Sequence, residues 1–273
     1  MLSFTFCSFK GGTAKTSTAL HIGAYLAKNY KKKVLLVDFD SQANLSIGLG
    51  FGPDNLSTMA PVLQGEINLK DVIQKTSIPN LSLIPANAYL DGIEKTPQLG
   101  NDPYAHERLR RVLKTAETDF DFCFIDTPPS LGWLTQSAFF ASNYTIICAI
   151  PEAYSVIALR RLKDFHASIK QYHDIDTLGL ILSFWDERGA VNKEFLNEIT
   201  NTFPDKLFSS KIRRDVSVSR AVLEGKPVFE TEPNSRAAED YKLLAKEFLK
   251  KLDGKSLNSK LSKLIKEKKP VGV

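Results

Sequence analysis

The stretch that decides the fold is FKGGTAKTS, residues 9–17, in which two glycines are followed by a lysine and by hydroxyl side chains. It comes directly after the apolar run Leu2–Phe9. A strand, a glycine loop and a helix start in this order are typical of phosphate binding, because backbone N–H groups in the turn and at the helix N-terminus point at the anion. Lys15 supplies a full positive charge, and Thr16 is placed to bring its hydroxyl to Mg²⁺.

The loop departs from the general pattern G-x-x-x-x-G-K-[ST], because Phe9 and Ala14 stand where that pattern has glycine. The variant K-G-G-x-x-K-[ST] fits from Lys10 to Thr16 and resembles the deviant Walker A loop of the ParA/MinD group of P-loop ATPases. The resemblance implies that Lys10 reaches across a dimer interface to the phosphates of the ATP held by the other subunit. The loop residues implied to bind ATP are Lys10, Gly11, Gly12, Thr13, Ala14, Lys15, Thr16 and Ser17.

The composition is that of an ordinary globular protein. The chain has 273 residues, of which 43% are hydrophobic and 25% charged, and this favours one large α/β domain. No stretch approaches the roughly 20 apolar residues of a membrane span. Cys7, Cys123 and Cys148 form no C-x-x-C pair, which indicates a reducing cytosol and packing roles for the thiols.

Short apolar runs alternate with helical patterns, which predicts an α/β fold: a mostly parallel twisted sheet flanked by helices on both faces. The expected strands are Leu2–Ser8, Lys33–Phe39, Leu81–Ile84, Phe120–Ile125, Tyr144–Ile150 and Leu178–Phe184, and a short strand near Lys206–Phe208 is left open. The expected helices are Lys15–Asn29, Pro103–Thr118, Ser130–Ala141, Ser155–Gln171, Asn192–Thr202 and Ser235–Leu252.

The positive charge is concentrated at the C-terminal end. The net charge is +5, yet residues 246–269 alone contain nine lysines and three acidic residues, so the rest of the chain is near neutral. We therefore expect a P-loop ATPase domain over residues 1–252 and a basic, partly helical tail over residues 253–273. In the tail, four apolar residues share one helical face surrounded by lysines, which is also how a membrane-surface helix looks.

Two acidic segments follow predicted strands, at the edge where α/β sheets bind their ligands. VLLVDFDSQANLS, residues 34–46, resembles the family's D-x-D-P-Q segment, with Ser41 in place of proline. The resemblance implies that Asp40 orients the attacking water and lies near Mg²⁺, while Asp38 is more simply a loop-capping residue. FCFIDTPPSLGWLT, residues 122–135, is a Walker B pattern, in which Asp126 holds Mg²⁺ through its water shell.

The segment that begins KIRRDVSVSRAVLEGKPV, at residue 211, resembles the family's I-P-R-N-V-x-x-S-E-A…G-K-P stretch. The resemblance implies an adenine contact through Arg213 and Asp215. Arginines in this region and in an earlier loop give the family its sequence-independent DNA binding, for which clustered positive charge suffices. The residues implied to bind DNA are Arg188, Arg213, Arg214 and Arg220.

The resemblance as a whole implies a ParA-type partitioning ATPase of the short class, located in the cytoplasm on the nucleoid. ATP and Mg²⁺ assemble a sandwich homodimer that binds double-stranded DNA, and a DNA-bound ParB-type partner stimulates hydrolysis. The residues implied to be catalytic are Lys10, Lys15 and Asp40, and those implied to lie at the metal are Thr16, Asp40 and Asp126. Two alternatives stay open: a MinD-like ATPase that cycles on a membrane through the tail, and a DNA- or partner-binding scaffold that has lost turnover.

Overall fold

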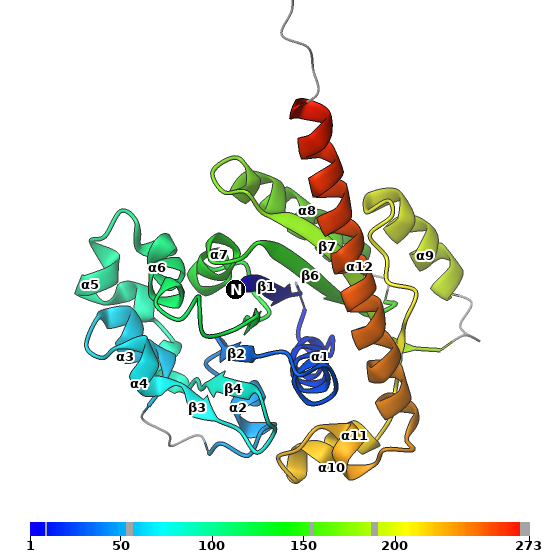
Figure 1. Cartoon of the computed structure of the whole chain (residues 1–273), viewed down its shortest axis with the longest axis horizontal. Helices are drawn as coiled ribbons and strands as arrows, with labels where there is room; N and C mark the ends of the chain where they lie inside the picture. Colours follow the sequence, from blue (N-terminus) through cyan, green and yellow to red (C-terminus); the bar gives the residue numbers. More distant parts are fainter. Residues whose placement is uncertain (9, 53–56, 153–154, 187–190, 268–273) are drawn as a thin grey trace, which may run out of the picture.

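The computed structural model describes residues 1–8, 10–52, 57–152, 155–186 and 191–267. Its centre is a twisted eight-stranded sheet in the order β3-β4-β2-β5-β1-β6-β7-β8 (Figure 1). All neighbouring strands are parallel except β3 and β4. The strands are β1 (Leu2–Cys7), β2 (Val34–Asp38), β3 (Gln74–Lys75), β4 (Leu81–Ile84), β5 (Phe122–Asp126), β6 (Tyr144–Ala149), β7 (Asp176–Trp185) and β8 (Ile212–Arg213).

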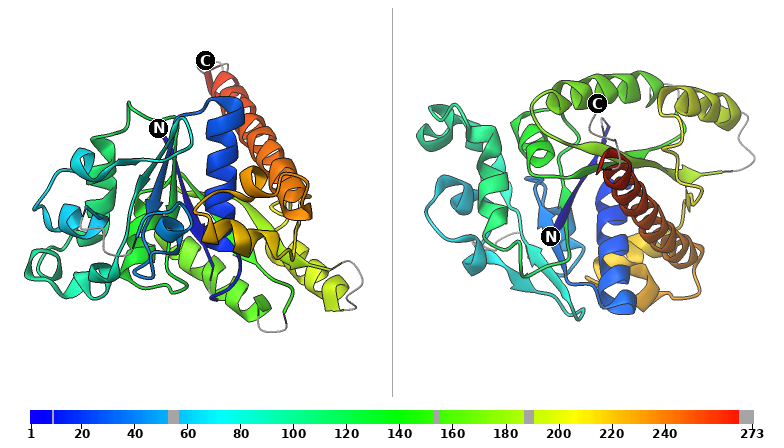
Figure 2. Two further views of the ribbon diagram at one scale, coloured as in Figure 1. Left: turned by 90° about the horizontal axis from the view of Figure 1, so that it is seen from below. Right: turned by 45° about the horizontal axis from the view of Figure 1, so that its top comes forward.

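Helices cover both faces of this sheet, and α1 and α12 lie next to each other on one of them (Figure 2). The longer helices are α1 (Lys15–Tyr30), α6 (Arg108–Lys114), α7 (Trp133–Phe140), α8 (Ser155–Lys170), α9 (Val191–Thr202), α10 (Ser217–Leu223) and α12 (Arg236–Glu267). The short helical elements are α2 (Asn44–Ile47), α3 (Met59–Gln64), α4 (Leu69–Val72), η1 (Ala88–Leu90), η2 (Ile93–Lys95), α5 (Pro97–Gly100), η3 (Ala105–Glu107) and α11 (Val228–Thr231).

The core consists of a cluster under α1 and α12 and two clusters on the other face of the sheet. Successive strand residues point to opposite faces, so Phe4 and Phe124 pack toward α12 while Cys7 and Ile125 pack the other way. Phe248 of α12 meets Phe4 and Phe124 edge-on, with ring centroids 5.1 and 5.5 Å apart. This aromatic cluster fixes α12 against the centre of the sheet.

The predicted fold class is confirmed, with differences in the short elements. β3 and β8 have two residues each, too short for an alternating pattern to mark them. The region Lys206–Phe208 makes only a single bridge, from Leu207 to Leu180, instead of a strand. The helix expected over Pro103–Thr118 is a 3₁₀ turn followed by α6, and the helix expected to end at Leu252 continues to Glu267.

The three cysteines are all buried and unpaired. Burial raises the pKa of Cys148 to about 12, so this thiol stays protonated and packs as a small apolar group. Among the described residues, no helix combines the length and the apolar character needed to cross a membrane.

Candidate nucleotide-binding site

A cavity of about 760 Å³ lies at the carboxyl edge of the sheet, a size typical of small-molecule sites. The loop between β1 and α1 forms one side of it, and Asp40 after β2 lies beside the loop. The opposite wall comes from Phe184 in β7 and from residues 212–216, which lead into α10. The sequence-predicted loop residues and Asp40, Arg213, Arg214 and Asp215 therefore surround one cavity, although their segments lie far apart in the sequence.

The loop is shaped to approach an anion closely. Gly12 has a φ of 74°, and a Cβ built on Gly11 or on Gly12 would meet nothing within 4 Å. Ala14 has a φ of 58°, in the left-handed region that costs a non-glycine residue about 1–2 kcal/mol. It is the N-cap of α1 and makes no side-chain cap, while its carbonyl accepts the first helical bond from Thr18 N at 2.8 Å. Ala14 thus adopts the left-handed conformation that glycine would adopt without this cost.

Lys15 and Asp126 form a buried ion pair below this loop, with Nζ and Oδ1 2.5 Å apart. Burial acts to lower the pKa of Lys15, but the charge of Asp126 and their hydrogen bond outweigh it, so this pKa is raised and the ammonium is retained. The other carboxylate oxygen, Asp126 Oδ2, is buried and has no hydrogen-bond partner among the described residues. The hydroxyl of Thr13 in the loop is buried and unpartnered in the same way.

Two further carboxylates lie at the end of β2. Asp40 is 7% exposed and accepts a hydrogen bond from Gln42 N at 3.1 Å. Burial raises its pKa, and the hydrogen bond from Gln42 N and the charge of Lys15 partly offset that rise. Asp38 is fully buried, and burial together with the neighbouring charge of Asp126 raises its pKa to about 7. Three acidic groups and one lysine thus share a small volume beside the loop.

Lys10, the lysine expected to act on a second subunit, forms an ion pair with Glu152 just after β6. Both side chains are about half exposed. In the single chain this lysine therefore lies at the surface beside its own loop, and its partner is a solvent-accessible carboxylate.

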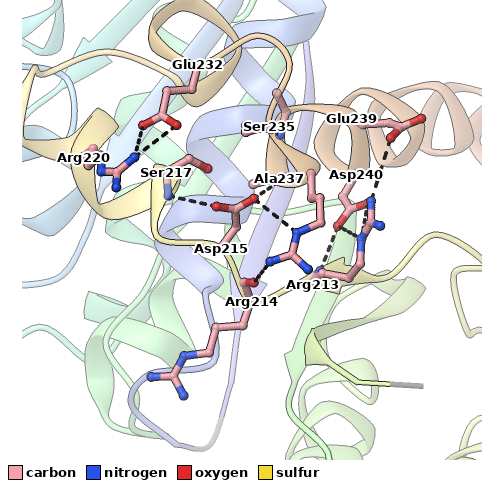
Figure 3. Close-up of polar contacts among 12 residues, drawn as sticks. Arg213, Arg214, Asp215, Ser217, Arg220, Glu232, Ser235, Ala237, Glu239 and Asp240 are labelled. Carbon is pink, nitrogen blue, oxygen red and sulfur yellow. Dashed lines mark hydrogen bonds and ion pairs between the residues drawn. The ribbon is translucent and has the colours of Figure 1, made fainter. Parts of the chain in front are cut away.

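Two residues of the wall, Arg213 and Asp215, are bound to the start of α12 (Figure 3). The guanidinium of Arg213 contacts Asp240, with Nη2 2.6 Å from Oδ1 and Nε 3.0 Å from Oδ2. The carboxylate of Asp215 accepts hydrogen bonds from Ser217 N at 3.0 Å and Ala237 N at 3.2 Å. The polar groups of both residues predicted to contact adenine are thus engaged with the protein, although both residues line the cavity.

The predicted DNA-binding arginines differ in their surroundings. Arg220 forms an ion pair with Glu232 at 3.2 Å, and Arg213 is held by Asp240. Arg214 is exposed; its guanidinium lies 5.7 Å from the centre of the Phe184 ring and extends away from the labelled carboxylates in Figure 3. Arg188 lies outside the described residues.

Among the cavity-lining residues that the sequence did not single out are Phe184, His21 and Tyr241. Phe184 has a φ of 53°, a strained conformation for an aromatic residue, and no motif marks it. His21 of α1 stacks on Tyr241 of α12, with ring centroids 4.3 Å apart, and contacts the carbonyl of Ser17 through Nδ1 at 2.6 Å. The stacking of His21 on Tyr241 depends on the packing of α1 against α12, which no local pattern encodes.

The parallel sheet, the glycine loop and the acidic strand ends define a P-loop nucleotide-binding protein. A model of the AAA domain family matches residues 2–177. A ParA family protein of Chlamydia muridarum is 51% identical over 242 residues, which cover 89% of this chain and 95% of the relative. The sporulation initiation inhibitor protein Soj of Bacillus subtilis is 35% identical, covering 87% of this chain and 94% of Soj.

The chain belongs to the ParA family, so the resemblance stated from the sequence is confirmed. Among solved structures, cobyrinic acid a,c-diamide synthase of Mycobacterium smegmatis, with bound ADP and magnesium, superimposes with a TM-score of 0.80. The two chains are 27% identical, and the match covers 92% of this chain and 95% of the synthase. This likeness confirms the P-loop architecture.

Proposed function

We propose that this protein is a ParA-type partitioning ATPase that binds ATP and Mg²⁺ in the cavity, dimerises in the ATP state and then binds DNA. The observation that carries the proposal is the buried Lys15–Asp126 pair directly below an open glycine loop. Membership of the ParA family supports the same role.

The residues of the site fit both ATP and Mg²⁺. Asp126 Oδ2 and Thr13 Oγ1 are buried polar atoms that the described protein groups leave unpaired, and such atoms ordinarily find a partner. The open space above Gly11 and Gly12 leaves room for phosphate oxygens. Thr16, Asp40 and Asp126 are the residues that would hold Mg²⁺, directly or through its waters, and the ion would supply positive charge that offsets the charge on the phosphates.

We assign the catalytic roles to the chain's own residues as follows. Lys15 leaves Asp126 and binds the phosphates, because a triphosphate offers its ammonium more negative charge than one carboxylate does. Asp40 holds the attacking water in line with the terminal phosphate. Lys10 exchanges its contact with Glu152 for the phosphates bound by the second subunit, where it stabilises charge that develops during hydrolysis.

DNA binding in this proposal depends on the pairing of two weak basic surfaces, because two such surfaces held in one dimer bind far better than either alone. Within the part of the chain that the structure describes, Arg214 is the proposed DNA-binding arginine whose guanidinium makes no ion pair with a carboxylate. A DNA-bound ParB-type partner accelerates hydrolysis and returns the dimer to monomers. Residues 253–273 add positive charge as a tail to the ATPase body of residues 1–252.

The rate of ATP hydrolysis by the Asp40→Ala variant tests the enzymatic part of the proposed function. We expect the variant to bind a non-hydrolysable ATP analogue while its rate with ATP, DNA and the partner falls by about 100-fold or more, because the water loses its positioning group. The control is Asp91→Ala, which removes a carboxylate that acts on Asp40 only through its charge. An unchanged rate in Asp40→Ala would contradict the assignment of Asp40.

A further inference from the structure

Asp38 is the last residue of β2 and is completely buried. In the register of β2 and β5 it lies directly beside Asp126, so two carboxyl groups stand next to each other below the phosphate loop. Burying an acid beside another acid is unfavourable unless strong hydrogen bonds hold it. The sequence gives no reason to treat Asp38 as more than a capping residue, so its contacts decide its role.

Both oxygens of Asp38 accept hydrogen bonds from a single loop. Oδ2 accepts from Ser46 N at 2.8 Å and from Ser46 Oγ at 2.7 Å. Oδ1 accepts from the backbone N–H of Asp40 at 3.3 Å. Ser46 is 1% exposed, and its Oγ in turn accepts from Ala86 N, just after β4, at 3.1 Å. The carboxyl group of Asp38 thus binds the start of the loop at Asp40 and the helix α2 at Ser46. Through Ser46 it is also linked to Ala86, just after β4.

This arrangement fixes two parts of the cavity at once. The backbone N–H that Asp38 binds belongs to Asp40, whose side chain faces the cavity. The serine that Asp38 binds lies in α2, whose neighbouring residues Asn44 and Ile47 line the cavity wall. Between them the chain turns through Ala43 in the left-handed conformation, at a φ of 54°. A strained turn of this kind persists only where its surroundings hold it.

We propose that Asp38 is a positioning residue for ATP hydrolysis, which acts by holding Asp40 and α2 in fixed places relative to Lys15 and the phosphate loop. The inference rests on the proposed function. Asp40 and the α2 residues Asn44 and Ile47 line the cavity, whereas Asp38 lies behind them and does not line it. Loss of the Asp38 contacts displaces the carboxylate that holds the attacking water, and displacements of about 1 Å can cost about 100-fold in rate.

The test compares Asp38→Asn and Ser46→Ala with Thr5→Val as the matched control. In Asp38→Asn an amide replaces one accepting oxygen and faces N–H donors, while the shape stays the same. Ser46→Ala removes the hydroxyl donor and keeps the backbone donor. Thr5→Val removes a buried hydroxyl that contacts Ala138 O at 2.8 Å and Ser142 Oγ at 2.7 Å, away from the cavity. The measurements are kcat and KM for ATP, the Kd of a non-hydrolysable analogue, and Tm.

We expect Asp38→Asn to lower kcat by about tenfold or more and Ser46→Ala by a smaller factor, with the Kd of the analogue within about threefold of wild type. Thr5→Val should lower Tm and leave kcat unchanged. A wild-type kcat in both Asp38→Asn and Ser46→Ala would overturn the inference. It would also be overturned if kcat fell in proportion to the loss of Tm in all three variants, Thr5→Val included. If Asp38→Asn does not fold, Ser46→Ala decides by the same criterion.

The same series separates this inference from the proposed function. If the wild type hydrolyses ATP, and Asp40→Ala abolishes this hydrolysis while Asp38→Asn leaves it unchanged, only the positioning role of Asp38 is contradicted. A wild type that does not hydrolyse ATP, with DNA and partner present, contradicts the proposed function and removes the basis of the positioning role.

Discussion

At the scale of single residues, the site depends on which charges the protein has already neutralised. Lys15 is paired with buried Asp126, Lys10 with half-exposed Glu152, and Arg213 with buried Asp240. In the proposed mechanism the lysines of the first two pairs exchange their carboxylates for phosphates. The third pair is held by three side-chain hydrogen bonds and by the bond from Arg213 N to Asp240 at 2.9 Å, so it stays with the fold.

The arginines of the DNA-binding proposal should therefore contribute unequally. We expect Arg214→Ala to weaken DNA binding by the ATP-bound protein and to reduce the slope of log affinity against log salt by about 1, because one phosphate contact is lost. Arg220→Ala is the matched control and should leave that slope nearly unchanged, because Glu232 already neutralises Arg220. A titration of non-specific double-stranded DNA over a range of salt measures both. An equal or larger loss in Arg220→Ala would contradict the distinction.

His21 makes stability depend on pH, because burial lowers its pKa from 6.5 to about 4. Between these values the unfolded chain binds a proton at His21 that the folded chain does not, so the free energy of unfolding falls as the pH falls through this window. The His21 contribution amounts to about 3 kcal/mol at most. Urea unfolding of wild type and His21→Gln at pH 7 and pH 4.5 isolates it, since the variant lacks the titrating ring. Equal losses in the two proteins would contradict the assignment.

At the scale of elements, α12 runs from the carboxyl ends of the strands to their amino ends. Near its start Asp240 binds Arg213 and Ala237 N binds Asp215, at the carboxyl edge. Farther along, Lys255 forms an ion pair with Asp176 at the beginning of β7. The nucleotide cavity and the C-terminal region are thus connected by one continuous helix, which packs beside α1 for part of its length (Figure 2).

The edge of the sheet near β7 depends on a close approach that only glycine allows. A Cβ on Gly179 would lie 2.4 Å from the Phe208 ring and 2.7 Å from the carbonyl oxygen of Lys206. We expect Gly179→Ala to lower the free energy of unfolding by about 1–3 kcal/mol through overpacking. Gly52→Ala is the control, because a Cβ there meets nothing within 4 Å. Urea denaturation compares the two, and equal stabilities would show that the segment at residues 206–208 can move aside at no cost.

At the scale of the whole molecule, the sequence predicted the sheet, the longer helices and the phosphate loop, because these follow from hydrophobic period and from a motif with a physical mechanism. It could not predict that Asp240 binds Arg213, since the partners are 27 residues apart and meet only once α12 has docked. The role of Asp38 was hidden for the same reason, because Ser46 and Ala86 reach it through the folded loop. The roles expected for Lys10 and Asp40 came from the family resemblance. In the single chain Lys10 contacts a solvent-exposed acid, and Asp40 lines the cavity.

The central claim is that ATP brings two chains together through Lys10. The most direct test is the mass in solution, by sedimentation velocity, of wild type and Lys10→Ala with a non-hydrolysable ATP analogue and Mg²⁺, with ADP, and without nucleotide. We predict that the wild type is a dimer with the analogue alone and a monomer in the other two conditions, while Lys10→Ala stays a monomer throughout and still binds the analogue. A wild type that remains a monomer with saturating analogue, or a Lys10→Ala variant that dimerises as fully as wild type, would contradict the account.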